Sequence, residues 1–118
     1  MIESKNATIT STMLGKEDHG IFTFVLHLDY GGSGQGAGTY ALSYGGYDEK
    51  EKFVPYMGEL LWRIMDTVGV RTWEDLRGEH IRVKADHCKV HAIGNFLRDK
   101  WLDFEEFFNA HMESNEQD

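Results

Sequence analysis

The 118-residue sequence contains one cysteine, one proline and no long apolar run. Because Cys88 is alone, no internal disulfide can form, and the chain suits a reducing compartment. A single proline (Pro55) and a hydrophobic fraction of 41% exclude a disordered, proline-rich chain. No apolar stretch approaches the roughly 18 residues of a membrane span, and residues 1–10 lack the basic and apolar segments of a signal peptide. We therefore expect a cytoplasmic protein that does not contact membranes.

Basic residues are also scarce, with 12 lysines and arginines against 20 aspartates and glutamates and a formal charge of −8. A protein that grips nucleic acid through phosphates needs a surplus of cations to displace counterions. The composition therefore disfavours direct binding of nucleic acid. It favours a protein partner with a basic surface, such as one that itself holds nucleic acid. A mildly acidic surface is also ordinary among soluble proteins, and that alternative stays open.

Glycine is concentrated in one segment, residues 30–46, which reads YGGSGQGAGTYALSYGG and contains seven glycines. A P-loop would need a Gly-Lys-Ser/Thr ending and a helix behind it, and a dinucleotide-binding loop would need a strand–turn–helix unit. Neither is present, because strand-like residues flank the segment. We expect the glycines to allow a hairpin turn, a bulge or a close backbone approach. Docking of a ligand or a partner on exposed amides is the alternative.

Residue periodicity predicts the secondary structure. Alternating apolar and polar residues predict strands over 6–15, 21–30, 39–44, 80–86 and 88–96. Apolar residues at helical spacing predict a main helix over 54–68 and a last helix over 104–112.

The ends of the helices carry their own signals. Gly69 is expected to end the main helix, Thr72 to cap a short helical turn and Asp103 to cap the last helix. The fold class is therefore α+β, an antiparallel sheet of about five strands packed by one main helix, with a short helical turn and a C-terminal helix. We expect a single domain over 1–112 and a flexible acidic tail over 113–118.

No spacing of residues indicates catalysis. Cys88 follows His87 directly, and neighbours on a strand point to opposite faces, so this pair cannot act as thiolate and base. Along the strand, Cys88, Val90 and Ala92 point to the same apolar face, which favours a thiol buried in the core instead. We therefore expect no catalytic residue and no enzymatic activity.

Six histidines raise the question of a metal. Zinc sites need three or four ligands, and neither Cys-x-x-Cys nor His-Glu-x-x-His spacing occurs. We expect no cofactor. A zinc site remains the alternative, with its candidate ligands being His19, His27, Asp29, His87 and His91.

Binding surfaces are better indicated than chemistry. Many side chains that should point outward from the strands are polar or basic, and arginine is favoured in interfaces. The candidate partner- or ligand-binding residues are Gly32, Ser33, Gly34 and Gln35 in the glycine-rich segment and His27, Asp29, Arg82 and Lys84 on strands. Flat glycine-rich strands also invite self-association, so a homodimer is predicted.

Three segments carry a resemblance to known proteins: EDHGIFTFVLHLDYGGSGQG, VGVRTWEDLRG and IRVKADHCKVHAIGN. They resemble small uncharacterised accessory proteins encoded by phages and mobile elements. The resemblance implies an anti-CRISPR-like protein that works in the host cytoplasm. Its expected function is non-enzymatic inhibition, by binding a host-defence effector such as a CRISPR–Cas complex and blocking a nucleic-acid or regulatory surface. The alternatives are a protein that binds a small ligand, such as a nucleotide signal, and a metal-binding protein.

Overall fold

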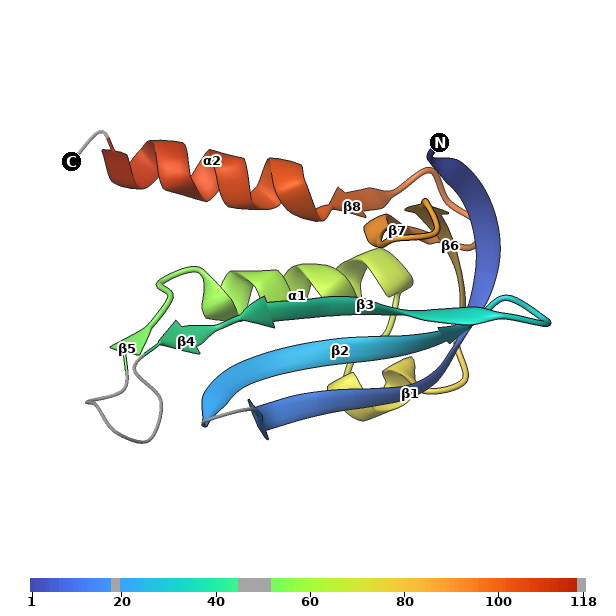
Figure 1. Cartoon of the computed structure of the whole chain (residues 1–118), viewed down its shortest axis with the longest axis horizontal. Helices are drawn as coiled ribbons and strands as arrows, with labels where there is room; N and C mark the ends of the chain where they lie inside the picture. Colours follow the sequence, from blue (N-terminus) through green and yellow to red (C-terminus); the bar gives the residue numbers. More distant parts are fainter. Residues whose placement is uncertain (18–19, 45–51, 117–118) are drawn as a thin grey trace.

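The computed structural model describes residues 1–17, 20–44 and 52–116 (Figure 1). Among these residues, six antiparallel strands form one sheet in the order β3-β2-β1-β6-β7-β8, and β4 pairs with β5 in a small second sheet. Two α-helices and a 3-10 helix complete the α+β fold, which confirms the predicted class with one strand more in the main sheet. Within this part of the chain, no helix is long and apolar enough to span a membrane. In chain order the elements are β1 (Glu3–Glu17), β2 (Ile21–Asp29), β3 (Gly34–Ala41), β4 (Ser43–Tyr44), β5 (Lys52–Phe53), α1 (Met57–Val68), η1 (Trp73–Leu76), β6 (His80–Ala85), β7 (Val90–Asn95), β8 (Trp101–Asp103) and α2 (Phe104–Glu116).

The long strand β1 joins the two halves of the sheet. Its N-terminal half, residues 3–8, pairs with β6, and residues 8–17 pair with β2. The register with β2 shifts between Ile9 and Ser11, and such a bulge bends a strand. At the bend, the Ile9 amide donates to the Glu79 carbonyl (2.9 Å) and the Ile9 carbonyl accepts from the Gly78 amide (2.7 Å). The sheet therefore curves around α1, as Figure 1 shows.

The core fills the inner face of this curved sheet. The apolar stripe of α1 buries Leu60, Ile64 and Val68 against the strands. In β2, Phe24, Leu26 and Leu28 are buried on the inner face and His27 and Asp29 are exposed on the other, although Thr23 and Val25 of that other face are also buried. An aromatic cluster joins β2, β3, η1 and α2, and its members are Phe24, Tyr40, Trp73, Phe104 and Phe108.

The helix ends follow the predicted signals. Gly69 has a φ of 97° and its amide donates to the Met65 carbonyl. The hydroxyl of Thr72 accepts from the Asp75 amide (3.3 Å), and the carboxylate of Asp103 accepts from the Glu106 amide (3.0 Å). All three predicted end signals are confirmed.

Two helix boundaries differ from the prediction. Helix α1 begins at Met57 rather than at residue 54, because Pro55 and Tyr56 form a turn before it. Helix α2 continues to Glu116, so residues 113–116 of the predicted tail are helical, and 117–118 lie outside the described residues.

The strand predictions need several corrections. Strand β1 is longer than predicted, running from Glu3 to Glu17, and strands β5 and β8 were not predicted, since two or three residues are too few to show alternation. The predicted strand 39–44 is divided, because β3 already begins at Gly34 and ends at Ala41, and Ser43 and Tyr44 form β4.

The glycine-rich segment forms both a turn and an edge strand. The Tyr30 amide donates to the Ser33 carbonyl (2.8 Å), and Gly31 has a φ of 94° within this turn. In β3, Gly38 has a φ of 112°, and a Cβ there would lie 2.6 Å from the Phe24 ring. The predicted turn and close approach are therefore confirmed, whereas Gly45 and Gly46 lie outside the described residues.

Replacing Gly38 tests this packing. The Gly38→Ala variant should lose about 1–3 kcal/mol of unfolding free energy, because the added Cβ would overlap the Phe24 ring in a backbone conformation that alanine rarely adopts. Urea unfolding followed by circular dichroism measures the change. The control is Gly58→Ala in α1, where a Cβ meets nothing within 4 Å and helix propensity should add roughly 0.5–1 kcal/mol. A Gly38→Ala midpoint equal to that of the parent chain would contradict the packing argument.

Candidate functional site

The face of the sheet turned away from α1 and α2 carries four of the eight predicted binding residues, His27, Asp29, Arg82 and Lys84; we call it the open face. On β6, His80, Arg82 and Lys84 alternate with the buried Ile81, Val83 and Ala85 and therefore point to the open face. His27 and Asp29 of β2 are exposed on the same face. Sheet pairing thus brings together candidates from two separate parts of the sequence.

A tryptophan and two cations form the first part of this site. Arg82 pairs across the sheet with Gly94, and Gly94 pairs with Trp101. Because Gly94 lacks a side chain, the indole of Trp101 lies over it, and a Cβ at Gly94 would be 2.6 Å from the indole ring. The indole then lies close to both cations, with Arg82 Cζ 4.9 Å and Lys84 Nζ 4.5 Å from a Trp101 ring centroid.

Arg82 is held in place by neutral acceptors. Its Nε donates to the Asn95 carbonyl (2.8 Å) and its Nη2 to the Arg98 carbonyl (2.7 Å). Neither Arg82 nor Lys84 forms an ion pair with a carboxylate in the described part of the chain. The positive charge of both side chains is therefore left available to an anion.

A shallow hollow of about 240 Å³ lies next to Arg82, whose cross-strand neighbour Asn6 is one of its lining residues. Its lining includes Asn6, Thr8, Asp29, His80 and Phe96. The Thr8 hydroxyl and His80 Nδ1 are 3.0 Å apart, and the rings of His80 and Phe96 lie 5.8 Å apart between centroids. The carboxylate of Asp29 accepts the Gly31 amide through Oδ1 (3.1 Å). The hollow therefore combines one aromatic wall with several hydrogen-bonding groups.

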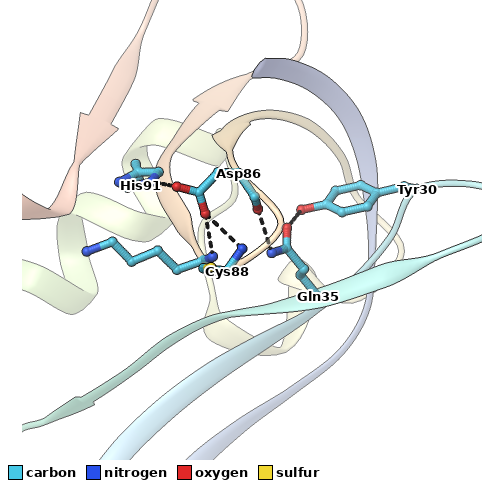
Figure 2. A network of polar contacts seen from close by, with 6 residues as sticks. Tyr30, Gln35, Asp86, Cys88 and His91 are labelled. Atoms are coloured by element: carbon cyan, nitrogen blue, oxygen red, sulfur yellow. Dashed lines mark hydrogen bonds and ion pairs between the residues drawn. The ribbon is translucent and has the colours of Figure 1, made fainter. Parts of the chain in front are cut away.

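The glycine-rich turn places its residues differently. Gly32, Ser33 and Gly34 are exposed at the β2–β3 turn, whereas Gln35 is half-buried. Gln35 Oε1 accepts the Tyr30 hydroxyl, and its Nε2 donates to the Asp86 carbonyl (2.9 Å), as Figure 2 shows. Burial raises the pKa of Tyr30, so its hydroxyl stays protonated as the donor at neutral pH. Gln35 is thus engaged within the protein and links β3 to the turn between β6 and β7.

Asp86 organises that turn (Figure 2). Its Oδ2 lies 2.9 Å from His91 Nε2, and its Oδ1 accepts the amides of Cys88 (2.8 Å) and Lys89 (2.9 Å). The hydrogen bond from His91, followed by those from Lys89 and Cys88, holds the pKa of the Asp86 carboxyl well below its ordinary value. The expectation of a core thiol is wrong, because Cys88 lies in this turn and is exposed.

The candidate metal ligands are dispersed. His27 and Asp29 lie on β2, His91 is engaged with Asp86, and His87 is exposed in the turn. His19 lies outside the described residues. Among the residues that are described, no three His, Cys, Asp or Glu side chains come together as a metal site.

The aromatic residues Trp101 and Phe96 also belong to the site. Both lie close to the loop between β7 and β8, where alternation is too short to assign a face. The only local signal was an aromatic residue on each side of Arg98 and Lys100. Their contacts with β6 depend on the sheet pairing, which no local pattern encodes.

Acidic residues gather on the helices instead. Glu105 and Glu106 are exposed in the first turn of α2, which contains neither lysine nor arginine. Glu74 and Asp75 are exposed in η1. The first turn of α2 is therefore acidic while Arg82 and Lys84 lie on the open face, although Asp29 is exposed on that face and Arg63 on α1. Acidic residues in a first helical turn also complement the helix dipole.

Comparison with known proteins gives no counterpart: no family model, no curated protein and no solved structure matches this chain. The chemistry of the site is therefore derived from its own residues.

Removing the Asp86 carboxylate should change how stability depends on pH. Because the folded pKa of Asp86 is lowered, this group stabilises the fold above its unfolded pKa of about 3.9 and loses that effect as the pH falls further. Asp86→Asn should therefore be less stable than the parent chain at pH 7, with a smaller difference near pH 2. Urea unfolding at both values measures this.

The matched control for Asp86 is Asp99→Asn, since Asp99 is exposed and makes no hydrogen bond or ion pair among the described residues. Its difference from the parent chain should be near zero at both pH values. An Asp86→Asn difference that stays the same from pH 7 to pH 2 would contradict the assigned role of the carboxylate.

Proposed function

We propose that this protein acts without catalysis, by binding a basic surface of a partner protein and blocking it. The observation that supports this function is the separation of charge. Helix α2 exposes Glu105 and Glu106 and contains no lysine or arginine, while Arg82 and Lys84 lie on the open face. A surface of one sign attracts and orients a partner of the opposite sign.

The partner we propose is a host-defence effector, with a CRISPR–Cas complex as the leading example. The resemblance of three segments to phage-encoded accessory proteins supports this choice, and so does the formal charge of −8. An effector that holds nucleic acid offers a basic groove, because it must neutralise phosphates. An acidic protein in that groove competes with nucleic acid by occupying the same cations.

Affinity purification tests the proposal. The tagged protein, expressed in cells that contain a defence effector, should retain that effector, and retention should fall as salt concentration rises. Cells that carry the protein should also lose their targeting of phage. Failure to retain any effector, together with unchanged phage targeting, would count against the proposed function.

A charge-reversal variant tests the surface. Glu105→Lys combined with Glu106→Lys should weaken binding roughly tenfold, because two favourable contacts become repulsive. The control is Glu79→Lys, which changes an exposed carboxylate in the loop before β6. Equal weakening by the control would show that overall charge, and not α2, determines binding.

A further inference from the structure

The hollow on the open face has the size and lining of a site for one flat ring. Its volume of about 240 Å³ is below the roughly 300–1,000 Å³ of pockets that enclose a whole ligand. Phe96 forms a wall with 41% of its surface exposed, and His80 lies against it. Aromatic side chains of this kind stack on nucleobases in a way that tolerates different bases. The hollow therefore suits part of a ligand, with the remainder outside it.

The other lining groups match the edge of a base. Asn6 carries both a donor and an acceptor in its amide. Asp29 uses Oδ1 for the Gly31 amide, and its Oδ2 remains as an acceptor for an amino or ring N–H group. A purine presents such donors and acceptors along its edge, next to the face that stacks.

Arg82 lies next to the hollow, and Lys84 follows it two residues further along β6 on the same face. Arg82 is the cross-strand neighbour of Asn6 and lies two residues from His80 on the same face of β6, a separation of roughly 6.4–6.8 Å. Arg82 keeps Nη1 free of the two carbonyl contacts made by Nε and Nη2. Lys84 is exposed, and the neighbouring β1 residues Ser4 and Asn6 are uncharged. An anion beside the hollow would thus meet two donors that no described carboxylate neutralises.

From this juxtaposition we propose that the open face binds a purine mononucleotide, with the base in the hollow and the phosphate on Arg82 and Lys84. A free nucleotide is favoured over a nucleic-acid strand. A strand needs a track of cations along its backbone, whereas this site offers two cations in a chain with a formal charge of −8. No residue that lines the hollow belongs to α2, so the site is independent of the proposed protein partner.

Calorimetric titration of the purified chain at low salt tests the site. GMP and AMP serve as probes, with guanosine and inorganic phosphate as the two halves of the ligand. We expect saturable binding of at least one nucleotide, with each half at least tenfold weaker, because the aromatic wall and the cations act on different parts of one molecule. Absence of saturation by either nucleotide at millimolar concentration would overturn the proposal. A single-stranded oligonucleotide that binds more tightly than the mononucleotides would overturn it equally, by assigning the site to a strand.

Variants test the residues. Lys84→Glu and Phe96→Ala should each weaken nucleotide binding about tenfold or more, because they remove a charge-assisted contact and the stacking wall. The matched controls are Lys16→Glu on β1 and Met112→Ala on α2, both exposed and neither among the residues that line the hollow. Far-ultraviolet circular dichroism and urea midpoints confirm that each variant is folded. Binding that survives both site variants, or that falls equally with the controls, would overturn the assignment.

The results of the nucleotide titration and of the partner purification can be told apart. Titration uses the isolated chain, and Lys84→Glu leaves α2 unchanged. A nucleotide-binding defect with normal retention of the partner, or the reverse, therefore identifies which proposal fails.

Discussion

The bend of β1 is the constraint on which the rest of the structure depends. One continuous strand pairs with β2 along residues 8–17 and with β6 along residues 3–8, so a register shift at Ile9 turns one half of the sheet relative to the other. The bent sheet wraps the apolar stripe of α1, and the loop residues Gly78 and Glu79 bind the Ile9 backbone at the bend. The bend lets the sheet enclose the core, and Thr8, which pairs with both Asp29 and His80, joins the two halves of the open face.

A second link joins the edge strand β3 to the turn between β6 and β7 on the other side of the curved sheet. Gln35 of β3 donates to the main chain of Asp86, whose carboxylate in turn holds the β6–β7 turn and His91 (Figure 2). The carboxylate is well suited to this position because it accepts from one side chain and two backbone amides. The same contacts explain why Gln35, though it follows an exposed glycine-rich turn, serves the fold of the protein.

Much of the fold could be predicted because its signals are local. Alternation along β2 assigned its inner face, and single residues such as Gly69, Thr72 and Asp103 marked helix ends. The candidate site could be predicted only in part from such local signals. Arg82, Lys84 and Asp29 could be placed on outward strand faces, but nothing local indicated that Gly94 would leave room for an indole.

The sequence by itself determined which residues form strands and helices, which strand faces are buried, and that the chain carries an excess of acid. These properties follow from contacts within a few residues and from composition. Tertiary structure alone decided that Asn6, Arg82, Gly94 and Trp101 lie in one row, and that the cations lie on the sheet while α2 remains acidic. The reason is that strand register is set by pairing between distant segments, so the neighbours of an outward side chain exist only once the sheet has formed.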